Sequence, residues 1–363
     1  LSVLTGSILT HSTSSESGLQ IEADHVVVDE TSSIDVSARG YRGGRRDGNG
    51  ADYGLTLGDA PGAQFRSAGS YGGYGGVQDG TGSNLPYGHP SQPVYLGSGG
   101  SRGYYGEAGG NGGGLLHIVA RKSIEVDGSL LAIGGTGDGS SAGGGSGGSI
   151  HVQTSFIKGT GVISANGGGN QVGGGGGRVA IEYDYVGVSG DDFSGLRNIT
   201  AFSGRGSSRA GSAGTVLLHR SDQTLGDLYV DDNMADGGVP NETASIYTPL
   251  VPISFGAVQA LTADTLTMDG LVGVMPNGLV GIEINPNVNQ TQTYVIVSNT
   301  VDAVMVDTTG KPALTSVASV GDTYVGVYRF DNVFFRRGGF LVTADQLVVN
   351  DTMQIDEYGR LTH

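Results

Sequence analysis

Two histidines in the middle of the chain are the first residues whose spacing suggests chemistry. His117 and His151 occupy the same outward position in two aligned segments, each of which follows a run of glycines. If these segments are stacked strands, the two imidazoles lie about 4.8 Å apart, close enough to share a metal ion. The equivalent positions of the next two segments are Ala180 and Leu217, which cannot ligate a metal. A plain stack of side chains is therefore the favoured interpretation.

Three oxygen-bearing side chains, Asp47, Asn49 and Asp52, follow one another within six residues. This spacing resembles the oxygen-rich loops that hold Ca²⁺, although the regular EF-hand spacing and its bidentate glutamate are missing. We keep two interpretations, a calcium-stabilised loop and a solvated turn, and favour the turn. Apart from this candidate Ca²⁺ site, the sequence predicts no cofactor.

Neighbouring carboxylates are candidates for acid and base catalysis, because parallel β-helices also carry polysaccharide lyases and hydrolases. The candidates are Asp184, Asp191 with Asp192, and Asp231 with Asp232. Adjacent residues of a strand point to opposite faces, so neither pair is placed to converge on a substrate. We therefore predict no catalytic residue and a protein that is not an enzyme.

Glycine-flanked tyrosines form a candidate ligand patch. The chain has 16 tyrosines, and the four that define the patch are Tyr71, Tyr74, Tyr104 and Tyr105. A tyrosine offers an apolar face and a polar tip, which suits stacking on sugars or sticking to surfaces. The alternative is that these rings shield a thin core from water. Both interpretations are compatible with an adhesive surface.

Four Asn-X-Thr sequences are formal acceptors of N-linked glycans. Their number in a threonine-rich chain is close to chance, and they matter only if the source glycosylates exported proteins. The four asparagines are Asn198, Asn241, Asn289 and Asn350.

The elements that would position these residues must be built without cysteine, because the chain has none and so can form no disulfide. Glycine accounts for 69 of 363 residues, but there is no strict Gly-X-Y period and only 10 prolines, which excludes collagen. A hydrophobic content of 37% can sustain only a thin core. Stability must therefore come from backbone hydrogen bonds and stacked aliphatic side chains.

Charge and hydropathy exclude two classes of partner. The net charge is −16, from 35 acidic and 19 basic residues, and affinity for nucleic acid depends on basic residues that neutralise phosphates. No apolar stretch approaches the ~18 residues of a membrane helix. We therefore predict neither a nucleic-acid partner nor a membrane span. The chain starts at Leu1 without a signal-type segment, and we expect a mature product or a piece of a longer protein.

Internal repetition is the strongest signal in the sequence. Four segments align position for position when each is superimposed on the last glycine of the run before it. Strand alternation then places two rows of aliphatic residues on the inward side. The rows are Leu116, Ile150, Val179 and Val216, and Ile118, Val152, Ile181 and Leu218. Such ladders are typical of the coils of a parallel β-helix.

We predict an all-β fold, a parallel β-helix or β-solenoid with glycine-rich loops and a second β module before the C-terminus. The solenoid covers residues 1–240, and its part 41–114, rich in Gly, Tyr and Ser, is expected to be a long loop lying on it or to be locally disordered. A β-rich module follows at 241–340, and a coil resumes at 341–363. Residues 359–363 repeat part of the sequence at residues 6–11. A C-terminal segment that resembles the N-terminal one is typical of a structure that continues in a further repeat.

These phrases resemble the large glycine-rich tandem repeat modules of giant bacterial surface proteins, which are adhesin-like. The resemblance rests on Leu9-Thr-His-Ser with Ser33-Ile-Asp-Val-Ser-Ala-Arg-Gly-Tyr, on the glycine runs from 143 to 181, and on Val297-Ser-Asn-Thr with Val320-Gly-Asp-Thr-Tyr-Val-Gly-Val-Tyr-Arg-Phe-Asp-Asn. It covers most of the chain in the expected order. The resemblance implies an extracellular tandem repeat with no catalytic residues.

A solenoid buries its apolar faces only against neighbouring coils, so each end must be capped or continued. The sequence shows no polar cap at either terminus, and an open end presents a strand edge that can pair again. We expect an extracellular structural repeat that forms a filament, sheath or stalk on a bacterial surface, with copies of itself or adjacent repeats as partners. The alternatives are a carbohydrate-binding or adhesion module that contacts surface glycans and, less favoured, a β-helix polysaccharide lyase or hydrolase.

Overall fold

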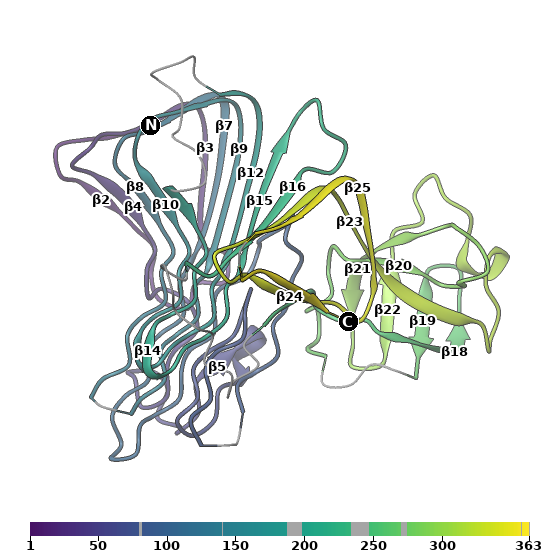
Figure 1. The fold of residues 1–363 in the computed structure, drawn as a ribbon, viewed down its shortest axis with the longest axis horizontal. Helices are drawn as coiled ribbons and strands as arrows, with labels where there is room; N and C mark the ends of the chain where they lie inside the picture. Colours follow the sequence, from purple (N-terminus) through teal and green to yellow (C-terminus); the bar gives the residue numbers. More distant parts are fainter. Residues whose placement is uncertain are drawn as a thin grey trace.

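The computed structural model describes residues 1–79, 82–139, 141–186, 198–233, 247–269, 274–356 and 358–362. This part of the chain is all-β, with one large mixed sheet, several small sheets and two short 3-10 turns at Leu57–Asp59 (η1) and Leu314–Ser316 (η3). Figure 1 shows two bodies, with long strands and glycine-rich segments in the first and shorter, more curved strands in the second.

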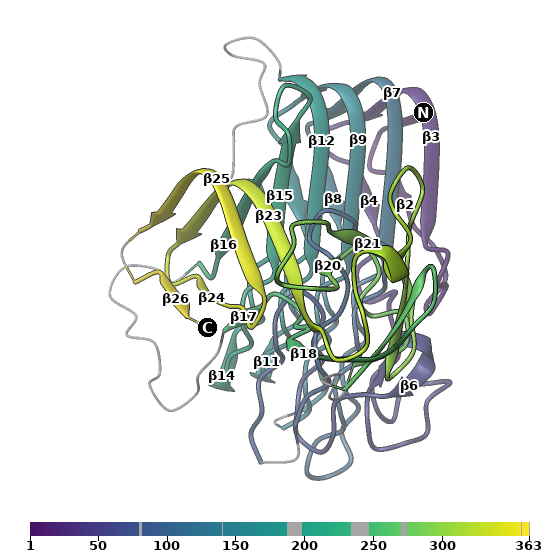
Figure 2. The same ribbon diagram turned by 90° about the vertical axis from the view of Figure 1, so that its right-hand side faces the viewer.

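The first body contains two parallel sheets that the chain visits alternately, and we call it the first stack. Each strand lies beside its equivalent from the preceding turn of the chain, as the row of long strands in Figure 2 shows. The long strands are β1 (Ser2–Val3), β3 (Leu19–Val28), β7 (Leu115–Val126), β9 (Ser149–Lys158), β12 (Arg178–Val186) and β15 (Thr215–Arg220). The short strands are β2 (Ile8–Leu9), β4 (Ser33–Asp35), β8 (Ser129–Leu131), β10 (Val162–Ser164) and β13 (Ile199–Thr200).

The two predicted aliphatic ladders are confirmed by the strand pairing. Leu116 pairs with Ile150, which pairs with Val179, and the second row is in the same register. These side chains are buried against the short strands, except Leu218, which is partly buried at the end of its row. Full burial of such a side chain stabilises the fold by roughly 1.5–3 kcal/mol. The ladders therefore supply a continuous core for the first stack.

The glycine runs form a second kind of core beside this one. We call it the glycine bundle, and it consists of extended segments that belong to neither helix nor sheet but exchange backbone hydrogen bonds with one another. Figure 1 shows these segments running side by side below the strands. The segments are 36–44, 67–76, 97–102, 109–114, 132–135, 143–148, 165–168, 173–177, 201–204 and 210–214.

Segment 143–148 shows how the bundle is organised. Its successive amides donate in turn to three different neighbouring segments, and the pattern repeats after three residues. The acceptors are Ser101 and Ser98 for Gly143 and Ser146, Val172 and Gly175 for Gly144 and Gly147, and Gly135 and Ala132 for Gly145 and Gly148. Three residues per turn is the period of the polyproline II helix, which has no internal hydrogen bonds. Here the neighbouring segments satisfy its backbone in place of water.

Close backbone contact explains why these segments need glycine. A Cβ on Gly145 would lie 1.9 Å from the carbonyl oxygen of Asn111, and one on Gly214 would lie 1.8 Å from that of Gly177. Because the obstructing atoms belong to backbone, no side-chain rotation relieves the overlap. Residues 41–114 supply three of these segments. These three segments are therefore part of the bundle and are hydrogen-bonded to segments that connect the strands of the first stack.

After β15 the chain reverses and builds a second stack. β16 (Asp227–Asp231) runs antiparallel to β15, and then pairs in parallel with β23 (Thr323–Arg336), which pairs in parallel with β25 (Gln346–Ile355). A small parallel sheet accompanies them, formed by β17 (Thr248–Pro249), β24 (Phe340–Val342) and β26 (Arg360–Thr362). The first stack therefore ends before the predicted boundary at residue 240.

A side module is inserted between β17 and β23, within the predicted β-rich region. Its strands pair antiparallel with one another, and both its first and its third strand pair with β23. The strands are β18 (Phe255–Leu261), β19 (Thr265–Met268), β20 (Glu283–Asn285), β21 (Tyr294–Asn299) and β22 (Ala303–Val306). Two small pairs, β5 (Leu55–Thr56) with β6 (Ala60–Pro61) and β11 (Asn170–Val172) with β14 (Gly206–Arg209), border the glycine bundle.

Candidate functional site

The two ends of the molecule each carry a strand edge that is only partly paired. At the N-terminal end, β1 covers β3 only at Val27 and Val28, so the remainder of that edge has no partner strand in the described part of the chain. At the C-terminal end, β25 pairs with β23 on one side and with no described strand on the other. Such edges expose unpaired backbone donors and acceptors, which can pair with another strand.

Apolar side chains are exposed beside both edges. Ile8 is 69% exposed at the N-terminal end, with Leu1 and Leu4 nearby in the sequence. At the C-terminal end, Ile355 is 48% exposed and Leu361 is 37% exposed. The pairing partners of these last two, Phe335 and Leu341, are fully buried. At the C-terminal end, the row that is buried at Phe335 and Leu341 is therefore exposed to solvent in the next strands.

The two terminal parts of the chain share one strand-turn-strand unit. Each unit has two residues six positions apart, one on each strand. Both pair with residues that are also six positions apart, on the two neighbouring strands. At the N-terminal end these are Val3 and Leu9, paired with Val28 and Ile34; at the C-terminal end they are Phe335 and Leu341, paired with Ile355 and Leu361. The sequence shared by residues 6–11 and 359–363 thus lies in a backbone unit that occurs at both ends.

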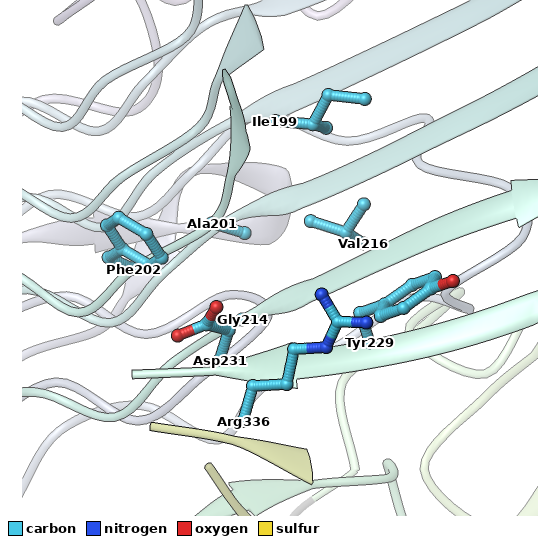
Figure 3. Close-up of a pocket in the computed structure, with 8 residues that line it drawn as sticks. All are labelled: Ile199, Ala201, Phe202, Gly214, Val216, Tyr229, Asp231 and Arg336. Carbon is cyan, nitrogen blue, oxygen red and sulfur yellow. The ribbon is translucent and has the colours of Figure 1, made fainter. Parts of the chain in front are cut away.

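The internal end of the first stack, beside β15, is closed. Arg336 and Tyr229 cover the last aliphatic residues, Ile199 and Val216, and leave a cavity of about 10 Å³ (Figure 3). The Arg336 guanidinium lies 4.9 Å from the centre of the Tyr229 ring, which stacks on Phe334. A space of this size holds about one water molecule. The open ends are therefore those at β3 and β25.

His117 and His151 stack as predicted, with ring centres 4.9 Å apart and an angle of 16° between their planes. The His151 ring bonds to Glu182 at 2.9 Å, and Nδ1 of His117 lies 2.8 Å from Oε1 of Gln20. Burial lowers the pKa of His117, as does the neighbouring His151. In the described part of the chain, no three His, Cys, Asp or Glu side chains gather as a metal site would require. The favoured interpretation as a side-chain stack agrees with these contacts.

Two of the three candidate calcium ligands, Asn49 and Asp52, make contacts with protein groups. The side-chain amide of Asn49 donates to the carbonyls of Gly43 and Tyr53, and its oxygen accepts the Ala51 amide. Asp52 forms ion pairs with Arg45 and Arg102. Asp47 is exposed. This geometry is that of a turn held by arginine, and Ca²⁺ binding stays a prediction.

The four tyrosines of the predicted patch do not share one surface. Tyr71 is fully buried, and Tyr74 is half-buried with its ring 5.3 Å from that of Tyr247. Tyr104 and Tyr105 are 60% and 83% exposed, and their rings meet edge to face. The predicted patch is thus reduced to Tyr104 and Tyr105.

Tyr71 belongs to a buried cluster that sequence reasoning missed. Its ring lies 5.5 Å from the guanidinium of Arg178, which is fully buried on β12. Arg178 donates two hydrogen bonds to the carbonyl of Tyr87 and one to the hydroxyl of Thr215. Burial lowers the pKa of Arg178. The tyrosine-rich segment is thereby fixed to the outer face of the first stack. The only sign of this cluster in the sequence is the arginine itself, because the other three aligned segments have Leu, Ser and Thr at that position.

Replacement of Arg178 by alanine is expected to lower the free energy of unfolding by about 3 kcal/mol. The substitution leaves a cavity and removes the hydrogen-bond donors of the buried Tyr87 carbonyl. Removal of a buried charge is favourable, but it offsets only part of this loss of stability. Urea unfolding followed by circular dichroism measures the change. Arg121→Ala removes a half-exposed arginine from ion pairs with Glu22 and Asp24 and should cost much less than Arg178→Ala, because exposed ion pairs contribute little to stability. Equal losses in the two variants would contradict the role of Arg178.

The remaining candidates lie apart from one another. Asn289 is exposed in a turn, Asn350 donates to Asp331, and Asn198 donates to the carbonyl of Thr160. Asp231 pairs with Arg337 at 2.6 Å, and Asp184 lies on β12. Asn241, Asp191 and Asp192 lie outside the described residues.

The fold and the contacts above define an all-β protein with two strand stacks, a glycine bundle and two partly paired ends. The comparisons add no relative: no family model, no curated protein and no solved structure matches the chain. In the described part of the chain, no helix has the length and apolar character needed to cross a membrane.

Proposed function

We propose that the chain is a structural repeat of an extracellular assembly, in which β-solenoid units join end to end. The observation that carries this proposal is the shared strand-turn-strand unit at the two ends, with a free strand edge and exposed apolar residues at each. Burial of Ile355 and Leu361 by a further coil would extend the row that Phe335 and Leu341 begin. A filament, sheath or stalk on a bacterial surface is the assembly that we expect.

The joining step is strand addition. The free edge of β3 in one copy accepts a strand like β25 from the next, and main-chain hydrogen bonds supply the affinity. The six-residue spacing then brings the short strands, β26 and β2, to the same side of the junction. Side-chain alternation fixes the register, because a slip by one residue would turn the apolar row outward. The partner is therefore a copy of this chain or an adjacent tandem repeat.

Several features favour a structural role over catalysis. The backbone of the glycine bundle forms hydrogen bonds between neighbouring segments, and the aliphatic side chains of the ladders pack against one another. The carboxylates weighed as catalytic candidates that the structure describes are Asp184, in the first stack, and the pair Asp231 and Asp232, in and just after β16 of the second stack. The absence of cysteine is compatible with an exported protein as well as with an intracellular one, so the extracellular location rests on the proposed assembly. We accordingly propose an extracellular location and no enzymatic activity.

Substitution of Ile355 by lysine tests the assembly. A charged side chain at this half-exposed position should block burial against a further coil, so the variant should stay a single particle where the parent chain forms elongated particles. Sedimentation velocity at increasing protein concentration and negative-stain electron microscopy measure the difference. Ile8→Lys at the other end should have the same effect.

Val320→Lys is the matched control, because Val320 is 65% exposed on the loop before β23, away from both edges. This variant should assemble like the parent chain. If Ile355→Lys and Ile8→Lys also assemble normally, or if the parent chain stays a single particle at all concentrations, the end-to-end proposal is wrong.

A further inference from the structure

A cleft of about 480 Å³ lies beside the glycine bundle, where three parts of the chain meet. Glu16 and Tyr41 come from the first coils, Val94 and Tyr95 from the tyrosine-rich segment, and Asn277 from a turn of the side module. Its volume falls within the roughly 300–1,000 Å³ of small-molecule sites. None of the residues selected from the sequence contributes to it.

The polar groups of the cleft are held in place by buried partners. Tyr41 is buried, and its hydroxyl donates to Glu16 at 2.8 Å while accepting the Gly58 amide at 3.2 Å. The Tyr95 hydroxyl donates to the backbone carbonyl of Asn277 at 2.7 Å. The side-chain amide of Asn277 itself has no hydrogen-bond partner in the described part of the chain. One carboxylate and one free amide thus line the same cleft.

The walls between these groups are apolar. Leu57 and Val94 line the cleft together with the Tyr95 ring, and Val94 is 45% exposed there. Sugars combine an apolar ring face with hydroxyl groups that donate and accept hydrogen bonds, and half-exposed tyrosine with carboxylate and amide groups complements both. The carboxylate of Glu16 and the net charge of −16 oppose an anionic ligand.

We propose that this cleft binds a short segment of a neutral glycan. The Tyr95 ring and Leu57 contact the apolar face of a sugar, Asn277 donates and accepts hydrogen bonds with its hydroxyls, and Glu16 accepts from a further hydroxyl. The site does not depend on end-to-end assembly, because none of its residues lies on β3 or β25. An assembled chain would carry one such cleft per copy.

Isothermal titration of the whole chain with cellotetraose, maltotetraose, chitotetraose and tetragalacturonate tests this proposal. At least one neutral tetrasaccharide should bind, and tetragalacturonate should bind at least tenfold more weakly. Asn277→Gly should weaken neutral binding at least fivefold. This substitution removes the amide but suits the backbone, since Asn277 has a φ of 60°. Glu16→Gln keeps an acceptor for Tyr41 and should weaken binding less.

Two controls separate this site from other surfaces. Tyr105→Ser removes the most exposed ring of the glycine-flanked pair and should leave the affinity unchanged. Ile355→Lys should also bind normally, so failure of assembly and failure of glycan binding are distinguishable. The proposal is overturned if no neutral tetrasaccharide binds, if tetragalacturonate binds best, or if Tyr105→Ser abolishes binding while Asn277→Gly does not.

Discussion

Replacement of Gly145 by alanine should lower the free energy of unfolding by about 3 kcal/mol or more. The added Cβ would lie 1.9 Å from the carbonyl oxygen of Asn111, so the two segments must separate. Overpacking in a side-chain core typically costs roughly 1–3 kcal/mol, and here the loss of the hydrogen bond from Gly145 to Gly135 is added. Urea unfolding and hydrogen exchange of the bundle amides measure the effect.

Gly50→Ala is the matched control for this substitution. Gly50 has open space where its Cβ would lie, and its φ is not in the left-handed region. The alanine should therefore change stability by less than about 1 kcal/mol, and in the stabilising direction, because it restricts the unfolded chain. Similar losses in the two variants would show that close backbone packing does not decide where glycine is needed.

Replacement of Asp331 by alanine should cost about 4 kcal/mol, the largest effect that we expect from a single side chain. One oxygen of this buried carboxylate accepts the amides of Thr224, Leu225 and Gly226, at 2.8–3.0 Å, and the other accepts from Asn350. Alanine leaves three backbone donors without a partner where the chain reverses between β15 and β16. Urea unfolding measures the loss, and a loss below 1 kcal/mol would contradict this role.

Asp331→Asn separates the charge of this group from its acceptor capacity. The amide oxygen can still accept the three backbone bonds, so we expect a smaller loss of about 1–2 kcal/mol at neutral pH. Burial alone would raise the pKa of Asp331, but its hydrogen bonds outweigh burial and lower the pKa below its usual range. The charge therefore stabilises the fold above the unfolded pKa of about 4, and this contribution is lost as pH falls through the folded pKa. The difference in free energy of unfolding between the parent chain and Asp331→Asn should therefore become smaller at acid pH.

The first stack could be predicted because its side chains repeat with period two. The inward row from Leu116 to Val216 and the stacked pair of His117 and His151 follow from that alternation alone. The reversal after β15 could not be predicted in the same way. It is stabilised by Asp331, more than 100 residues later in the chain, and no local pattern in the sequence reports that contact.

The glycine bundle was missed for a physical reason. A segment with three residues per turn and several close neighbours needs glycine wherever another backbone approaches it, so it shows no polar and apolar periodicity. The sequence therefore looked like a loop, although these runs lie between consecutive strands of the first stack. The cleft was missed because Glu16, Tyr95 and Asn277 are far apart in the chain. Tyr71 is one of the four tyrosines of the predicted ligand patch, whereas Arg178 holds its ring inside.

The glycine bundle has a consequence for how stability varies with temperature. Unfolding of an aliphatic core exposes apolar surface and raises the heat capacity, whereas exposure of peptide groups lowers it. The bundle buries mostly backbone, so it should contribute little or even negatively to the heat-capacity change of unfolding. A smaller heat-capacity change flattens the stability curve. The chain would then keep its fold over a wider range of temperature than a protein of equal stability built on side chains alone.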